Sequence, residues 1–60
     1  MKVFIAIYTW NYSDDFRASE IKKLSFDYNK VKEYCDMENE ERIRRGDLNG
    51  EYEIEEFEID

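Results

Sequence analysis

The chain has 60 residues, a net charge of −7, and hydrophobic and charged fractions of 42% each. This length allows one domain, residues 1–60, with a small core, and the apolar content excludes a disordered chain. One cysteine and no histidine exclude an intrachain disulfide and disfavour a zinc site, and no apolar run is long enough to span a membrane.

Oligomerisation is the remaining common way to stabilise so small a domain, so we expect a homo-oligomer, in the simplest case a homodimer. The lone Cys35 and the lack of a signal-peptide pattern in MKVFIAIYTW predict a cytoplasmic protein. Residues 1–35 carry six Lys/Arg against five Asp/Glu, whereas residues 36–60 carry three Arg against eleven Asp/Glu. Direct binding to nucleic acid needs a basic face and is not expected; a basic protein surface is the more compatible partner.

The first predicted element is a strand over residues 2–12. Val3, Ile5 and Ile7 occupy one parity, and the other parity is also apolar. A strand that is apolar on both faces is typical of the centre of a sheet. The polar residues 11–15 predict a turn.

Residues 16–26 fit two patterns. A helical spacing connects the apolar residues from Ile21 onward, but the short preceding turn favours a hairpin with the first strand. We therefore predict a second strand over about residues 16–24.

A helix is predicted over about residues 28–45, with Asp27 as its N-cap. The apolar side of this helix is narrow and includes Cys35, which is therefore predicted to be a core residue. The second half of the helix is polar on all sides, so we expect it to be weakly held. Gly46 is the natural residue to end it. A last strand over residues 51–59 completes an α+β domain of β-β-α-β order, a small three-stranded antiparallel sheet packed on one helix.

Four pieces of the sequence carry a resemblance: Met1–Ile5, Ser19-Glu20-Ile21, Lys32-Glu33-Tyr34 and Tyr52–Asp60. Through them the chain resembles a loose group of very small, acidic, largely uncharacterised proteins of phages that infect Gram-positive bacteria. The resemblance covers most of the chain through short motifs. It implies the β-β-α-β fold and a phage setting, hence the host cytoplasm, and carries no catalytic residues. The glycine that the group often has late in the second strand is replaced here by Lys22-Lys23.

The stretch DLNGEYEIEEFE, from Asp47 to Glu58, imitates the acidic spacing of a calcium-binding loop. Tyr52 stands where that loop needs glycine, and no exiting helix fits after Glu58, so no metal is expected. The paired carboxylates lack a histidine partner and a pocket between them. We therefore predict neither enzyme activity nor a cofactor.

The large aromatic residues of the first strand share one parity: Phe4, Tyr8, Trp10 and Tyr12. One helix can cover only one sheet face. If Val3, Ile5 and Ile7 meet the helix, the aromatic residues form a partner-binding surface on the other face, suited to self-association. The alternative is that they lie under long side chains of the neighbouring strands.

The last strand predicts an acidic face, formed by Glu51, Glu53, Glu55 and Glu58. Successive same-face residues on a strand are about 6.8 Å apart, so such carboxylates form a row. A row of this kind can imitate a phosphate backbone, although an ordinary solvated face is the alternative.

The apolar residues of EYEIEEFEID change parity in the middle of the strand. Tyr52 and Ile54 share one face, whereas Phe57 and Ile59 share the other. Either a β-bulge brings all four side chains to the core, or Phe57 lies on a different surface and joins the partner-binding residues.

We expect a small non-catalytic binding protein that acts by protein–protein contact, and the resemblance suggests an inhibitor of a bacterial host or anti-phage defence protein. An acidic DNA mimic that blocks a nucleic-acid-binding groove is one alternative, and a structural accessory protein is another. Salt separates the first two, because a mimic loses affinity steeply as ionic strength rises.

Overall fold

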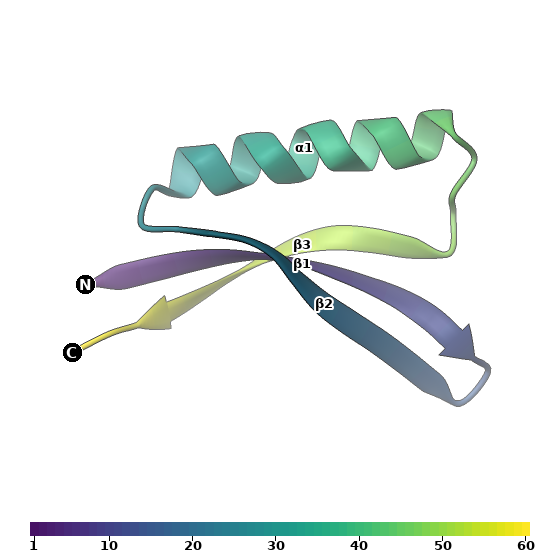
Figure 1. Cartoon of the computed structure of the whole chain (residues 1–60), viewed down its shortest axis with the longest axis horizontal. Coiled ribbons are helices and arrows are strands. Elements are labelled where there is room, and N and C mark those ends of the chain that lie inside the picture. Colours follow the sequence, from purple (N-terminus) through teal and green to yellow (C-terminus); the bar gives the residue numbers. More distant parts are fainter.

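The computed structural model describes residues 1–60 as one sheet and one helix (Figure 1). The elements in chain order are β1 (Lys2–Ser13), β2 (Phe16–Ser25), α1 (Tyr28–Arg44) and β3 (Gly50–Glu58). The sheet is antiparallel with the strand order β2-β1-β3, and α1 lies on one side of it. The predicted α+β fold and its β-β-α-β order are confirmed, and the ambiguous second segment is a strand.

β1 occupies the centre of the sheet, as its two apolar faces predicted. It pairs with β3 without interruption, from Lys2 opposite Glu58 to Trp10 opposite Gly50. Its pairing with β2 shifts by one residue at Lys22, which has no partner in β1. Such a bulge bends and twists a hairpin, and the joined ends of β1 and β2 lie away from α1 (Figure 1).

α1 begins and ends at the predicted capping residues. The Asp27 carboxylate accepts a hydrogen bond from the Asn29 backbone N–H at 3.0 Å. Gly46 has a φ of 80°, and the N–H groups of Gly46 and Asp47 donate to carbonyls of the last turn, which is the Schellman arrangement. This one helix is too short and too polar to cross a membrane.

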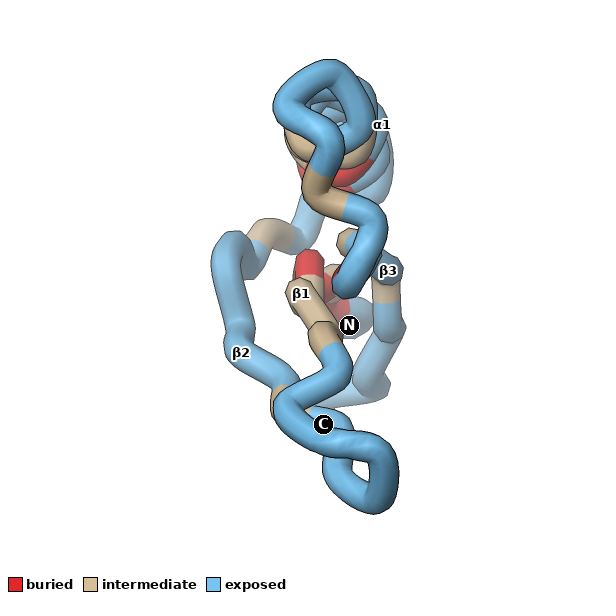
Figure 2. Tube along the Cα trace, turned by 90° about the vertical axis from the view of Figure 1, so that its right-hand side faces the viewer, coloured by how far each residue is buried: buried red, intermediate tan, exposed pale blue.

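The core lies between α1 and the middle of the sheet, where the buried segments face each other (Figure 2). Ala6 and Val31 are 0% exposed and Cys35 is 3% exposed, and four partly buried residues pack around them: Phe4, Tyr34, Tyr52 and Ile54. Burying a side chain such as Val31 stabilises the fold by about 1.5–3 kcal/mol. Cys35 is thus a core residue, as predicted, and burial raises the pKa of its thiol.

The helix covers the sheet face opposite to the one that we predicted. Ala6 meets α1, and side chains alternate along a strand, so Val3, Ile5 and Ile7 lie on the other face. The small Ala6 leaves room for Val31 between the sheet and the helix, while the larger aromatic residues of the same parity pack around this contact. Both parities of β1 are apolar, and hydrophobicity alone could not choose between them.

Tyr8 reaches from β1 to the loop that follows α1. Its hydroxyl donates to the Asp47 carboxylate at 3.0 Å, and burial together with this bond raises the pKa of the phenol. A Cβ at Gly50 would lie 2.6 Å from both the Tyr8 hydroxyl oxygen and the Thr9 carbonyl oxygen. Glycine is required at the start of β3 because the phenol and the backbone of β1 approach it so closely.

A polar side chain, Asn39, attaches the second half of α1 to the edge of β3. Its amide oxygen accepts from the Tyr52 backbone N–H at 2.9 Å, and its amide nitrogen donates to the Tyr52 carbonyl at 3.1 Å. Arg42 donates to the same amide oxygen at 3.0 Å and to the Asp47 carbonyl at 2.9 Å. The amide satisfies this part of the strand edge as a further strand would. The polar half of the helix, predicted to be weakly held, is therefore attached by hydrogen bonds.

Candidate functional site

The sheet face turned away from α1 is not covered by any element of the chain (Figure 1); we call it the open face. Strand pairing places Leu24 beside Ile5, Ile21 beside Ile7, and Phe57 beside Val3. Paired residues of antiparallel strands project on the same side of the sheet. These side chains form what we call the apolar stripe: Val3, Ile5, Ile7, Ile21, Leu24 and Phe57.

The apolar stripe is buried at its centre and exposed at its sides. Val3 and Ile5 are only 4% and 8% exposed although no helix covers them, whereas Ile21, Leu24 and Phe57 are 62%, 59% and 48% exposed. The edge-strand side chains shelter the central strand and present their own outer surfaces to solvent. A contiguous apolar surface of this kind marks an interaction site.

Three glutamates of β3 border the stripe, and we call them the acidic row: Glu51, Glu53 and Glu55. Their partners in β1 are residues of the open face, Thr9, Ile7 and Ile5. None of the three forms a salt bridge. The pKa of Glu53 is raised, mainly by a hydrogen bond with the Glu51 side chain and to a smaller extent by partial burial and by repulsion from Glu51 and Glu55. The row therefore holds crowded carboxylates that no lysine or arginine of the chain neutralises by a salt bridge.

The other two glutamates of β3 lie on the helix-covered side and are paired. Lys2 Nζ lies 3.6 Å from a Glu56 carboxylate oxygen, and the N-terminal amino group lies 3.2 Å from a Glu58 carboxylate oxygen. Placing Glu58 on the acidic face was therefore wrong. β3 pairs with β1 without a bulge, so its even-numbered side chains project opposite to the acidic row.

The predicted partner-binding residues do not form one surface: Phe4, Tyr8, Trp10, Tyr12 and Phe57. Phe4 packs against the core, and Trp10 stacks on Tyr8 with ring centroids 5.5 Å apart. Tyr12 is 75% exposed near the tip of the β1–β2 hairpin. Phe57 alone lies on the open face. The β-bulge alternative is wrong, because β3 pairs with β1 without a register shift. Phe57 does lie on a different surface from Tyr52 and Ile54, but it does not join the other four aromatic residues there.

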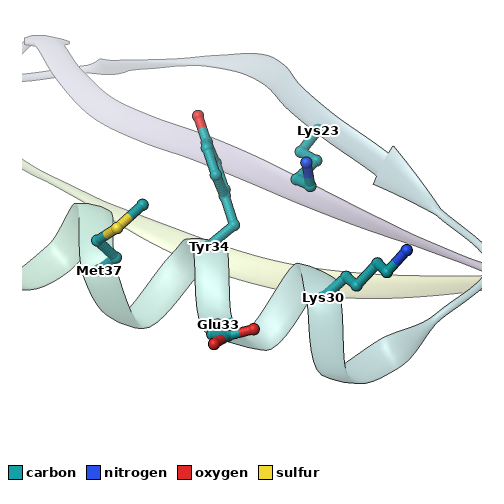
Figure 3. A pocket seen from close by; sticks show the side chains of 5 residues that line it. All are labelled: Lys23, Lys30, Glu33, Tyr34 and Met37. Carbon is teal, nitrogen blue, oxygen red and sulfur yellow. The ribbon is translucent and has the colours of Figure 1, made fainter.

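A groove of about 400 Å³ lies between α1 and β2 (Figure 3). Its lining residues are Lys23, Lys30, Glu33, Tyr34 and Met37. The Tyr34 ring stands between the helix and the strand, and Lys23 Nζ lies 5.6 Å from its centre in a cation–π contact. The groove has two lysines and a single carboxylate, Glu33, so it lacks the facing acid–base pair that hydrolysis needs.

The residues of the calcium-like stretch do not converge. Asp47 precedes β3 and Glu58 ends it, so the length of the strand, about 30 Å, separates them. The Asp47 carboxylate accepts hydrogen bonds from the Tyr8 hydroxyl and the Asn49 backbone N–H. No three His, Cys, Asp or Glu side chains are grouped around a possible metal position.

The sequence analysis did not identify two polar residues, one on the open face and one at the outer edge of β3. The Thr9 hydroxyl is buried and has no hydrogen-bond partner, and it stands opposite Glu51 in the sheet. Asn39 satisfies the outer edge of β3. Threonine in a strand and asparagine in a polar helix segment are both ordinary, so neither residue carried a signal in the sequence.

Comparison of the chain with protein-family models, with curated proteins and with solved structures found no match.

Proposed function

We propose that the protein is a small non-catalytic binding protein that docks another protein on its open face. One observation carries this proposal: the apolar stripe is contiguous, and its edge residues Ile21, Leu24 and Phe57 are each about half exposed or more. Exposed apolar area contributes about 25 cal/mol per Å² when a partner removes it from water. No other surface of the chain combines so many paired aliphatic side chains.

Binding of this kind would act by occupying a surface of the partner. The resemblance to small phage proteins supports a partner in the bacterial cell, and an inhibitor of a host or anti-phage defence protein is the role that fits both features. The groove at Tyr34 offers no facing acid–base pair. The buried Cys35 offers no reactive thiolate, because burial raises the pKa of its thiol.

An acidic DNA mimic is the second candidate, and the unpaired acidic row is the observation that favours it. The row has only three carboxylates, and Glu56 and Glu58 of the same strand project away from it and are paired. A mimic would act through charge alone, whereas the row borders an apolar stripe that a polyanion does not need. Protein docking on the stripe is therefore the better-supported function.

Affinity capture from a lysate of a Gram-positive bacterium tests the proposal when the bait is compared with matched variants. Leu24→Glu places a charge in the stripe and should abolish capture of the specific partner. Leu48→Glu is the control, because Leu48 is 78% exposed in the loop before β3 and its substitution should leave capture unchanged. Circular dichroism verifies that both variants fold.

Capture that survives Leu24→Glu would contradict docking on the open face. Capture that survives Leu24→Glu but disappears at about 500 mM salt would favour the DNA mimic, since charge-driven binding is screened at high ionic strength.

A further inference from the structure

We propose that the segment seated on the open face is an amphipathic helix of the partner, with lysine or arginine side chains along the edge that meets the acidic row. This inference rests on the proposed function and specifies the chemistry of the partner. It follows from the size of the face, from the position of its charges and from the poor fit of a second copy of the chain.

The open face has the dimensions of one helix. Nine residues of β3 at about 3.3 Å each and three strands at about 4.8 Å give a face of about 30 Å by 14 Å, near 400 Å². A stable interface between two globular proteins buries about 800 Å² on each partner. A helix of about 18 residues is about 27 Å long and would cover the stripe, as α1 covers the other face.

The charges define which edge of that helix is basic. The acidic row runs along β3, on one long side of the stripe, and its carboxylates have no salt-bridge partner. Same-face residues on a strand are about 6.8 Å apart, and helix residues at i, i+4 and i+8 are about 6 Å apart along the axis. Three cations at this helical spacing can therefore meet Glu51, Glu53 and Glu55 in turn.

A second copy of the chain fits this face poorly. Its own open face carries the same three glutamates and offers Arg17, opposite Asn11 in the sheet, as a cation. Each chain also carries a net charge of −7. Self-association would bring uncompensated carboxylates together, which costs free energy in a partly dehydrated interface.

The test uses the full chain and two synthetic peptides of about 18 residues, designed as helices with a leucine stripe. One peptide carries lysines along both sides of its leucine residues, and its twin carries glutamates at the same positions. Binding is followed by fluorescence anisotropy, and amide chemical shifts locate the contact. We expect the lysine peptide to shift resonances of β1, β2 and β3 on the open face and to bind at least about tenfold more tightly than its twin.

Matched variants then assign the charge effect to the acidic row. The triple variant Glu51→Gln, Glu53→Gln, Glu55→Gln should weaken binding of the lysine peptide about tenfold. The control variant Glu33→Gln, Glu40→Gln, Glu41→Gln changes the net charge by the same amount on α1 and should alter the affinity less than about twofold, because these carboxylates are distant and screened.

Equal binding of both peptides, equal effects of the two triple variants, or the absence of open-face shifts with the lysine peptide would each overturn the inference. Those results would leave the capture experiment untouched, so failure of the partner chemistry is distinguishable from failure of the proposed function. Sedimentation velocity is the remaining arm. A monomer is expected, and a dimer that Leu24→Glu dissociates would assign the open face to a second copy and overturn the inference.

Discussion

The two faces of the sheet are built from the same three strands and differ in how their polar groups are satisfied. On the helix-covered face Tyr8 donates to Asp47, Asn39 bonds the edge of β3, and Glu56 and Glu58 have cationic partners. On the open face the acidic row has no salt bridge and the Thr9 hydroxyl has no hydrogen-bond partner.

The chain therefore satisfies its polar groups on the helix-covered face and leaves several without partners on the open face. The helix-covered face pairs almost all of its groups within 60 residues, and its packing supports the fold. The open face combines exposed aliphatic side chains with unneutralised charge, so substitutions there should change binding more than stability. Changes in the free energy of unfolding measure this contrast between the two faces.

The largest effect is expected for Ala6→Leu, because Ala6 is 0% exposed and packs against Val31 and Cys35. Overpacking at such a site costs about 1–3 kcal/mol, a large part of the about 3–5 kcal/mol that a core of this size supplies. Urea denaturation followed by circular dichroism measures it. The same change at the partly exposed Ala18 of β2 should cost less than about 0.5 kcal/mol, and equal losses at both positions would contradict the assigned core.

The next effect is expected for Asn39→Leu, which removes two hydrogen bonds to the Tyr52 backbone. We expect a loss of about 1–2 kcal/mol and faster amide hydrogen exchange at Tyr52, measured by NMR. Asn29→Ala, at an exposed position in the first turn of α1, is the control. Unchanged exchange at Tyr52 in the Asn39 variant would mean that the amide does not protect the strand edge.

A smaller effect of opposite sign is expected on the open face for Thr9→Val. The substitution keeps the shape of the side chain and removes a buried hydroxyl without a partner, so it should raise the free energy of unfolding by about 0.5–1 kcal/mol. Thermal denaturation measures the change. A decrease of the same size would show that the hydroxyl is hydrogen-bonded in solution.

The smallest effect is expected for Glu53→Gln. The pKa of Glu53 is raised in the folded chain, so its contribution to stability is present below the unfolded-state value near 4.5 and is lost as the pH rises through the folded-state pKa. At neutral pH the substitution should therefore stabilise the chain by about 0.3 kcal/mol, a small value because water screens exposed carboxylates.

Glu56→Gln is the matched control on the helix-covered side of the same strand. It removes the pair with Lys2 and should leave stability unchanged or slightly lower. Denaturation between about pH 4 and pH 7 compares the two variants, and a destabilised Glu53→Gln would contradict the crowding of the acidic row.

The sequence was sufficient to predict the β-β-α-β order, the central place of β1 and both caps of α1. Each of these depends on local signals: the two apolar faces of one strand, the carboxylate of Asp27 and the left-handed conformation open to Gly46. The site was predicted less well. Phe57, Glu51, Glu53 and Glu55 lie on the open face, whereas Phe4, Tyr8 and Glu58 lie on the other side of the sheet.

What the sequence by itself determined is the set of elements and the two apolar parities of β1, because both follow from local periodicity. The tertiary structure decided which parity α1 covers. That choice depended on the close packing of Val31 and Cys35 on Ala6, and on long-range hydrogen bonds from Tyr8 and Asn39. Packing of this kind joins residues far apart in the chain, and it turned two equally apolar faces into one core and one open face.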